Sequence, residues 1–438
     1  MLFKKLLGLS LSTIFLLIFI SCNNSINQNA IKYVNGYIFD GIYFKKASFI
    51  VKDRKFNFDT STKTHNTVDL NGQYVIPPFG DAHTHNFDDI AKFDSIYKAY
   101  INEGTFYVQV LTNHYSNFLK IKDSLNFIGR IDAKFAHGGI TSTGGHPHSL
   151  YESQALNYSW RAMFDPEKKE EILSSRIKEN DAYYIIDTTN ELEKRWQSIV
   201  SNDPDLIKIY ILNTIEKARK KENKEVGTYG LSEDVIEAVV KKAEDENITL
   251  IAHVETIEDF ELVLNLGIKY FAHMPGYGGG IGDKEFEKLE IPDSLLQVAS
   301  KKNISITPTG SFAKYYANKW DGTKMSLDTT LLNNKYAFIR KQLRRFIDAK
   351  IKITLGADQN NTTLTEEIDD LIRIKAFSNL EFLNILVNTP KTIFPNRKIG
   401  EIKDGYEASF LVLKNNPLED LSNIKNIELR VKNGMILD

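Results

Sequence analysis

The chain has 438 residues, a formal net charge of −2 at neutral pH and 42% hydrophobic residues. This length exceeds what one compact core usually holds, so a barrel of about 250 residues or more with a smaller companion domain is a natural division. The nearly balanced charge argues against a general affinity for polyanions, so nucleic acid is not an expected partner.

The N-terminus departs from this average composition. Lys4 and Lys5 precede an apolar run over residues 6–20, which is typical of a signal peptide. A bilayer span needs roughly 17 to 25 residues, so a permanent transmembrane anchor is the weaker alternative. The run ends in Phe19-Ile20-Ser21-Cys22, which resembles a bacterial lipobox with Phe19 in place of the usual leucine.

Cys22 is the only cysteine, so an intrachain disulfide is excluded. We expect residues 1–22 to be a lipoprotein signal peptide with an acylated Cys22, followed by a polar tether over 23–30. The alternative is a cysteine that follows the signal by chance. Asn23 and Asn24 resemble the sorting residues of other lipoproteins. They favour export to the outer membrane of a Gram-negative bacterium, and leave open whether the protein faces the periplasm or the cell surface.

The sequence pattern at both ends of the mature chain is typical of a small sheet. Short β-rich stretches alternate with turn residues over 31–70, and similar stretches at 409–413 and 427–431 flank a turn-rich segment. We predict that residues 31–72 and 403–438 together form a β-sandwich.

Between these ends, strand-like apolar runs alternate with helical patterns, which indicates βα units and a parallel sheet. The runs fall at residues 73–77, 105–111, 130–136, 206–212, 248–254, 269–272, 304–308 and 352–355. Eight parallel strands are the number that closes a TIM barrel. The predicted fold class is therefore α/β, with a TIM (β/α)8 barrel over residues 73–402 and the β-sandwich built from both chain ends.

Two of the intervening helices have clear boundaries. Ser232 is expected to cap a helix with Glu233 and Asp234 in its first turn, and a second helix spans residues 256–266 and stops at Gly267.

Three connections are longer than a βα loop requires, at residues 141–205, 275–291 and 310–330. Loops after the strands build the active sites of barrel enzymes, so we expect substrate lids here. Residues 277–280 are a candidate glycine-hinged flap and residues 312–320 a candidate aromatic wall. Packing of the barrel rim is the alternative role for these aromatic residues.

Polar residues with metal-binding chemistry occur at or near several predicted strand ends. His83 and His85 follow the first strand, and alternation on an extended backbone points both imidazoles to one side. Lys208 lies inside an apolar strand, where a bare ammonium is costly to bury. The alternative is that Lys208 faces solvent from an edge strand, but a closed barrel has no edge strand.

His253 and His273 end the fifth and sixth predicted strands, and Asp358 ends the eighth. Alone, either histidine is more often a structural residue, and Asp358 could cap the helix that begins near residue 362. Together, histidines and carboxylates at the same ends of different barrel strands converge on the axis, where zinc and similar metals favour such ligands.

At this point the sequence resembles the amidohydrolase superfamily over essentially its whole length after the tether. Tyr74-Val75-Ile76-Pro77 leading to Asp81-Ala82-His83-Thr84-His85 is similar to its strand-one signature, and Lys208, His253, His273 and Asp358 follow in the family's order. Residues 399–405 with 408 and 416–418 resemble the return to its β-sandwich. Two positions depart from the pattern: Pro78-Phe79-Gly80 replaces the usual Pro-Gly, and Ser409 stands where aspartate is common.

The resemblance implies two divalent metal ions. The first would be held by His83, His85, Asp358 and a carbamate formed from CO2 on Lys208, and the second by the carbamate, His253 and His273. Zinc is the first expectation, with manganese, cobalt or iron as alternatives. A hydroxide bridging the metals would attack a carbonyl, and Asp358 would act as general base and then as general acid toward the leaving nitrogen.

Within the superfamily, Thr143-Gly144-Gly145-His146 favours the imidazolonepropionase-like and prolidase-like branch. His146 is a candidate substrate contact, and Tyr210 is a candidate oxyanion donor because it lies two residues after Lys208 on the same side of its strand. Packing or loop hydrogen bonding is the alternative for both, and also for His114 and His148. His137 is a weaker candidate, and His65 lies outside the barrel.

The predicted function is hydrolysis of a non-ester carbon–nitrogen bond in a small-molecule substrate: an amide, a cyclic amide or a dipeptide-like compound. A lactonase or another ester or phosphoester hydrolase on the same centre is the first alternative. A binding lipoprotein without catalysis is the alternative of another class. The sequence names neither the substrate nor the oligomeric state.

Overall fold

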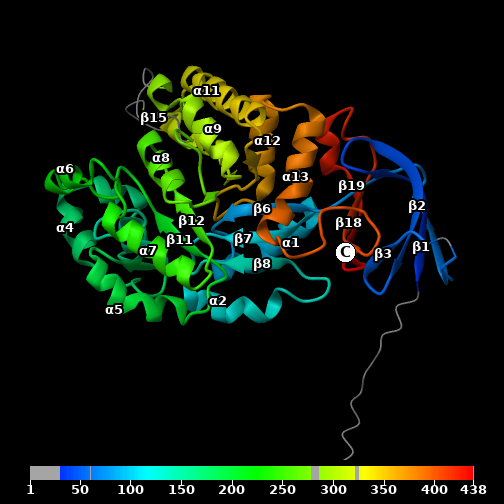
Figure 1. Cartoon of the computed structure of the whole chain (residues 1–438), viewed down its shortest axis with the longest axis horizontal. Helices are drawn as coiled ribbons and strands as arrows, with labels where there is room; N and C mark the ends of the chain where they lie inside the picture. Colours follow the sequence, from blue (N-terminus) through cyan, green and yellow to red (C-terminus); the bar gives the residue numbers. More distant parts are fainter. Residues whose placement is uncertain (1–29, 60, 278–285, 321–324, 438) are drawn as a thin grey trace, which may run out of the picture.

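The computed structural model describes residues 30–59, 61–277, 286–320 and 325–437. The predicted signal peptide, Cys22 and nearly all of the predicted tether lie outside these residues. Within the described ranges, no helix combines the length and the apolar character needed to cross a bilayer. Parallel strands with helices around them make this an α/β protein (Figure 1).

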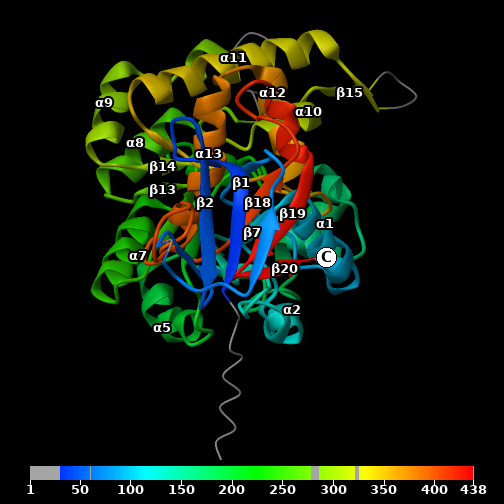
Figure 2. The ribbon, with the colours of Figure 1, turned by 90° about the vertical axis from the view of Figure 1, so that its right-hand side faces the viewer.

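Strands from both ends of the chain form one hydrogen-bonded sheet. Its order is β20-β19-β18-β5-β1-β2-β3, and β4 pairs with β1. In Figure 2 the blue N-terminal strands stand beside the red C-terminal ones, at the side of the molecule that faces the viewer. The strands are β1 (Ile31–Phe39), β2 (Phe44–Lys52), β3 (Lys55–Asn57), β4 (Asn66–Asp69), β5 (Tyr74–Ile76), β18 (Phe410–Leu413), β19 (Ile427–Lys432) and β20 (Met435–Leu437).

This terminal sheet has its own apolar core. The rings of Tyr33, Phe49 and Phe410 lie with centroids 5.1 to 5.2 Å apart, and all three side chains are buried. The edge strand β3 reaches back to the segment before β18 through a bridge between Lys55 and Glu407. Both chain ends therefore join in one sheet, as predicted, while its description as a sandwich stays a prediction.

The rest of the sheet structure is parallel. One group has the order β6-β7-β8 and the other β10-β9-β11-β12-β13-β14-β17. A backbone hydrogen bond from Asp205 to Phe135 (3.0 Å) and one from Ala82 to Leu355 (2.7 Å) join the two groups at both sides. The strands are β6 (Phe79–Thr84), β7 (Thr105–Val110), β8 (Asp132–Phe135), β9 (Gly139–Thr141), β10 (Tyr183–Ile185), β11 (Ile207–Tyr210), β12 (Leu250–His253), β13 (Tyr270–Phe271), β14 (Ser305–Ile306) and β17 (Lys352–Ile353).

One predicted strand is wrong. Residues 73–77 were expected to open the parallel sheet, but β5 pairs with β1 and β18 in the terminal sheet. Pro77 and Pro78 interrupt the chain after β5, since proline lacks the N–H that a strand ladder needs. The parallel sheet starts instead with β6, which contains His83. Each of the other predicted runs contains an observed strand.

The helices lie around the parallel strands (Figure 1). Both predicted boundaries are confirmed: α7 begins after Ser232, and Thr256 caps α8 by accepting the amide of Asp259 at 3.1 Å. The helices are α1 (Phe93–Glu103), α2 (Tyr115–Ile121), α3 (His148–Ala155), α4 (Pro166–Ser174), α5 (Thr189–Val200), α6 (Lys217–Glu222), α7 (Glu233–Asp245), α8 (Ile257–Asn265), α9 (Asp293–Lys301), α10 (Ala313–Tyr316), α11 (Thr329–Asp348), α12 (Leu364–Ile374) and α13 (Asn379–Ile393).

The three long connections contain secondary structure of their own. Residues 141–205 hold α3, α4, β10 and α5. Residues 310–330 hold α10 and the hairpin of β15 (Asn318–Trp320) and β16 (Met325–Leu327). In the connection over 275–291, residues 278–285 lie outside the described residues, and most of the predicted glycine flap lies there.

A buried charge network joins the terminal sheet to the parallel strands. Lys432, which is fully buried on β19, places Nζ 2.6 Å from Asp132 Oδ2 and 2.9 Å from Glu407 Oε1. Arg397 binds Asp132 at 2.8 Å and also contacts Glu407. Asp132 is the first residue of β8, so this network lies at the N-terminal end of a parallel strand.

Candidate metal centre

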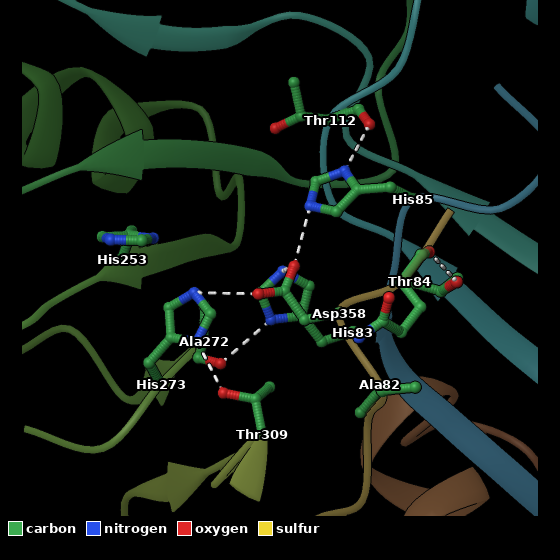
Figure 3. Close-up of polar contacts among 12 residues, drawn as sticks. Ala82, His83, Thr84, His85, Thr112, His253, Ala272, His273, Thr309 and Asp358 are labelled. Atoms are coloured by element: carbon green, nitrogen blue, oxygen red, sulfur yellow. Dashed lines mark hydrogen bonds and ion pairs between the residues drawn. The ribbon is translucent and has the colours of Figure 1, made fainter. Parts of the chain in front are cut away.

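The predicted ligands gather at the opposite, C-terminal ends of the parallel strands. His83 lies at the end of β6 and His253 at the end of β12, while His85, His273 and Asp358 follow strand ends (Figure 3). Ring centroids are 4.7 Å apart for His83 and His273, and 4.4 Å apart for His253 and His273. This is the end of the strands at which barrel enzymes bind their substrates.

Three of these residues form the tightest group. Single ligand atoms of His83, His85 and Asp358 all lie within 4.8 Å of one another. Nε2 of His83 is 3.1 Å and Nε2 of His85 is 3.0 Å from the same oxygen, Oδ1 of Asp358. Nε2 of His273 is 3.8 Å from the other carboxylate oxygen.

Hydrogen bonds at the other ring nitrogen set the tautomer of these histidines. Nδ1 of His83 lies 3.0 Å from the carbonyl of Ala272, and Nδ1 of His85 lies 3.0 Å from the carbonyl of Thr112. A carbonyl only accepts, so each Nδ1 carries the proton and donates it. Burial lowers the pKa of His83 to about 4, so at neutral pH its Nε2 has a lone pair and no proton.

The same argument applies to His273. Its Nδ1 is 2.8 Å from Oγ1 of Thr309, and that hydroxyl donates its own proton to the carbonyl of Pro308 at 2.9 Å. The Thr309 oxygen therefore accepts from Nδ1, and Nε2 of His273 faces Asp358 as a further lone pair.

Asp358 is ionised within this group. Burial would raise the pKa of its carboxyl, but His83 and His273 outweigh burial and hold the pKa well below its usual value. Nε2 of His83 and Nε2 of His85 thus lie 3.1 and 3.0 Å from the carboxylate, and Nε2 of His83 is buried without a hydrogen-bond partner among the described residues. Nitrogen and oxygen donors that converge in this way suit zinc and related ions.

The backbone around Asp358 is held in an unusual conformation. Asp358 has φ +52°, and its amide donates to the carbonyl of His83 at 2.6 Å. A Cβ at Gly356 would lie 2.5 Å from the amide nitrogen of His83, so only glycine allows this approach. Thr112 and Thr309 also have positive φ values, +104° and +49°. Strained residues of this kind concentrate at functional sites.

Asp81 fixes β6 to the Asp358 segment. It accepts the amide of His83 at 3.1 Å and that of Ala357 at 3.3 Å, and Tyr100 donates its hydroxyl at 2.9 Å. These bonds align the two chain segments that carry the cluster.

Lys208 is buried in the middle of the parallel sheet, between β9 and β12. No hydrogen bond or ion pair to its ammonium group is found among the described residues, and burial lowers its pKa to about 7. The solvent-facing alternative for this lysine is therefore wrong. A large fraction of the amine is uncharged at neutral pH, which is the form that reacts with CO2.

His253 is oriented differently from the other histidines. Its Nε2 lies 3.2 Å from Oε1 of Glu255. In the other histidines of the cluster it is Nδ1 that has a hydrogen-bond partner, either a carbonyl or a hydroxyl. Nδ1 of His253 is then the nitrogen left for a ligand role.

The two predicted substrate residues lie beside His253. The ring centroid of His146 is 5.2 Å and that of Tyr210 is 5.4 Å from the His253 ring. The hydroxyl of Tyr210 shares a 2.7 Å hydrogen bond with Oγ1 of Thr112. Burial lowers the pKa of His146 to about 3, so His146 is neutral at physiological pH.

Three of the remaining histidines have structural partners. His148 accepts the amide of Gly144 at 2.9 Å and lies 3.2 Å from the carbonyl of Ser175. His137 packs among aromatic rings, and His65 is exposed in the terminal segment. His114 pairs with Asp88 at 2.9 Å.

Sequence reasoning missed the residues that orient the ligands. Thr112, Thr309 and Glu255 each bind a ring nitrogen or a hydroxyl of the cluster. Tyr277 stacks on His273 with ring centroids 4.0 Å apart. The available signal was their position, because the two threonines follow strand ends and Glu255 follows His253 by two residues.

The comparisons with known proteins place this arrangement in a family. The profile of the amidohydrolase family matches residues 207–437, just over half of the chain. The chain belongs to the amidohydrolase family. This confirms the prediction of an amidohydrolase enzyme, and metal binding is typical of the family. Ochratoxinase of Aspergillus niger is 24% identical over 193 residues, which are 43% of this amidohydrolase and only 37% of the curated relative.

Solved structures resemble nearly the whole amidohydrolase chain. The crystal structure of A. niger ochratoxinase aligns with a TM-score of 0.71 and 16% identity, over 93% of this chain and 95% of that one. A prolidase complexed with N-methylphosphonate-L-proline aligns at 0.67 and 15%, over 93% and 99%. A Xaa-Pro dipeptidase with bound methionine aligns at 0.65 and 16%, over 93% and 100%. At these identities the likeness concerns the fold, and it implies a TIM barrel with an additional domain.

Proposed function

We propose that this amidohydrolase cleaves a carbon–nitrogen bond, in an amide, a cyclic amide or a dipeptide-like compound, with two divalent metal ions. One observation carries the proposal. Nε2 of His83 and Nε2 of His85 face the Asp358 carboxylate at 3.1 and 3.0 Å while the Nδ1 protons are engaged elsewhere. Nitrogen and oxygen donors that converge in this way suit a divalent cation such as zinc.

The donor set divides into two groups in this proposal. His83, His85 and Asp358 would hold one ion, and His253 and His273 would hold the other. A carbamate on Lys208 would serve both: the uncharged amine attacks CO2, a nitrogen–carbon bond forms, and one proton is released. The low pKa of Lys208, about 7, supports this step because it supplies the uncharged amine at neutral pH. Zinc is the first candidate, with manganese, cobalt or iron as alternatives.

Bound divalent ions lower the pKa of water and polarise a carbonyl. The chain's own residues would then move protons and position the substrate. Asp358 would accept a proton from the attacking water and deliver it to the leaving nitrogen. Tyr210 would donate its hydroxyl to the developing oxyanion, and His146 would contact the substrate from the same side.

The names of similar proteins support the bond type. Ochratoxinase, prolidase and Xaa-Pro dipeptidase stand among them, together with a molinate hydrolase. We extend to this chain only the cleavage of a carbon–nitrogen bond in a small molecule. The finer architecture in this proposal is a closed (β/α)8 barrel with a β-sandwich formed by both chain ends.

We also propose that the enzyme is exported and anchored to a membrane, with the outer membrane of a Gram-negative bacterium as the favoured site, through acylated Cys22. The proposal rests on the residues 1–24 alone. Metabolic labelling with a radioactive fatty acid should label the full chain and not a Cys22→Ser variant, and equal labelling of both would contradict it.

A substrate panel tests the proposed function. Dipeptides, N-acyl amino acids, cyclic amides and lactones are assayed with the zinc and manganese forms of the full chain. Turnover of a carbon–nitrogen substrate that depends on the metal supports the proposal. Turnover of lactones alone would move the assignment to an esterase-type hydrolase.

A further inference from the structure

Glu255 is a carboxylate at the metal centre that the proposed mechanism does not use. It follows the end of β12 by two residues, and its Oε1 lies 3.2 Å from Nε2 of His253. The His253 ring in turn lies 4.4 Å from that of His273 and 5.2 Å from that of His146. The Glu255 side chain is 39% exposed, whereas that of His253 is 4% exposed. Glu255 therefore stands between the ligand cluster and open space.

No hydrogen bond or ion pair to the second oxygen of this carboxylate is found in the part of the chain that the structure describes. Among the described residues, neither a lysine nor an arginine forms an ion pair with Glu255, and His253 engages only Oε1. The lysine whose charge acts on Glu255, Lys220, already binds Glu225 at 2.9 Å. The charge of Glu255 is thus left for a group that comes from outside the described chain.

Tyr277 and Tyr316 lie on the same side of the cluster as His253. Tyr277 has its ring centroid 6.2 Å from that of His253, and its hydroxyl shares a hydrogen bond with Tyr316. The amide of Gly276, the residue before Tyr277, donates to the backbone carbonyl of Glu255 at 3.1 Å, so the two segments are adjacent. Burial raises the pKa of both tyrosines, and the charge of Glu255 adds to this. Tyr316 is half exposed. A carboxylate beside tyrosine rings is an environment that binds an ammonium group.

We propose that Glu255 binds a positively charged amino group of the substrate, so that the enzyme prefers compounds with a free amine next to the scissile carbonyl over their N-acylated counterparts. This inference rests on the proposed hydrolase function and narrows its substrate class to aminoacyl compounds. The α-ammonium of such a compound is one carbon away from the scissile carbonyl, which suits a carboxylate next to His253. An N-acylated substrate would leave the Glu255 carboxylate without a partner. The loss of this ion pair should make the enzyme discriminate strongly against N-acylated substrates.

The decisive variant is Glu255→Gln. Glutamine keeps an oxygen that accepts the Nε2 proton of His253, so only the charge is removed. The readout is the ratio of kcat/KM for L-alanyl-L-proline to that for N-acetyl-L-alanyl-L-proline, with dipeptides of other sequence as further pairs. A role limited to orienting His253 would slow both substrates equally and leave this ratio unchanged.

We expect the parent enzyme to favour the free amine by roughly tenfold or more. In Glu255→Gln the ratio should fall to within about threefold of unity, because the variant loses its advantage for the free amine whatever its rate on the N-acetyl compound. Glu258→Gln is the matched control, because Glu258 is an exposed glutamate three residues further along the chain. The control should keep the parent ratio. An unchanged ratio in Glu255→Gln, a parent preference for the N-acetyl compound, or loss of metal from the variant would overturn the inference.

A binding measurement distinguishes a failure of this inference from a failure of the proposed function. If no carbon–nitrogen substrate of the panel is hydrolysed, the proposed function fails, and calorimetry still tests Glu255. L-Phenylalaninol carries an ammonium group and 3-phenyl-1-propanol does not. The parent should bind L-phenylalaninol at least tenfold more tightly than Glu255→Gln does, with the uncharged alcohol bound equally by both. Equal binding of L-phenylalaninol by parent and variant would overturn the inference.

Discussion

The two ends of the parallel strands each hold a cluster of buried charged and polar residues, and the clusters differ in how they are paired. At the N-terminal end, Lys432 meets Asp132 and Glu407 at 2.6 and 2.9 Å, so each charge has an opposite charge beside it. At the C-terminal end, Nε2 of His83 and Nε2 of His85 lie 3.1 and 3.0 Å from the Asp358 carboxylate, and the described residues place no lysine or arginine on it. The first cluster is complete without a ligand, and the second is not.

This difference indicates what each cluster does. A buried network of opposite charges satisfies itself and locks two parts of the fold together, and removing one partner leaves an unpaired charge. A buried group of imidazole nitrogens and a carboxylate is suited to bind a cation from solution. Substitutions at the metal centre should therefore change turnover more than stability, and substitutions in the Lys432 network should do the reverse.

The largest effect is expected for Asp358→Asn. The amide keeps an oxygen ligand but cannot take up the proton of the attacking water, so kcat should fall about 10³- to 10⁴-fold while most of the metal stays bound. Steady-state kinetics and metal analysis of the same preparation measure both. Near-parent turnover would remove Asp358 from the mechanism.

The next effect concerns stability. Lys432→Met removes the cation from between Asp132 and Glu407, so the free energy of unfolding should fall by about 3–5 kcal/mol, with unchanged metal content. Denaturant unfolding measures this. Lys46→Met, at an exposed lysine of the same sheet, should change stability by less than about 0.5 kcal/mol. A loss of metal with unchanged stability would reverse the assigned roles.

The same network predicts a pH dependence. Burial would raise the pKa of Glu407, but Lys432 and Arg397 outweigh burial and lower it to about 2. Because the folded pKa lies below the unfolded value near 4.5, the stabilisation is present above about pH 4.5 and is lost as pH falls toward 2. The loss should be about 3 kcal/mol. Across this pH range, the free energy of unfolding should fall more steeply with falling pH for the parent than for Glu407→Gln. Parallel pH profiles of the two proteins would contradict the assignment.

The smallest effect is expected for Tyr210→Phe. If the Tyr210 hydroxyl stabilises the oxyanion, its loss should lower kcat roughly 10- to 100-fold with little change in metal content or stability. Tyr184→Phe, which loses only a hydrogen bond from Asn202, is the matched control and should keep kcat within about twofold. Equal kcat values for Tyr210→Phe and the parent would limit Tyr210 to packing against His253.

The sequence predicted most of the parallel strands because a strand buried on both faces is a continuous apolar run, as at Ile251 and Ala252. It missed β6, whose Asp81, His83 and Thr84 make the segment polar although every residue in it is buried. The hydrophobic pattern therefore pointed to β5 instead. Polar residues can fill a buried strand only when partners from elsewhere satisfy them, and such partners are not adjacent in sequence.

The candidate site was also predicted only in part. His83, His85, His253, His273 and Asp358 were predicted from their positions at or after strand ends and from the family resemblance, and the structure gathers them at one end of the strands. Lys208, predicted from its place inside an apolar strand, is buried within β11. Their roles as ligands stay predictions. The tautomers could not be predicted, because they depend on the carbonyls of Ala272 and Thr112 and on Glu255, which approach only in the folded chain.

The most direct test of the account is metal analysis of the full chain purified without chelator, beside Lys208→Ala. We expect about two metal ions per chain in the parent and a clear loss in the variant. Lys217→Ala, at another buried lysine outside the cluster, should keep the parent content. A parent preparation that is free of metal and yet fully active, or a Lys208→Ala variant that keeps both ions, would contradict it.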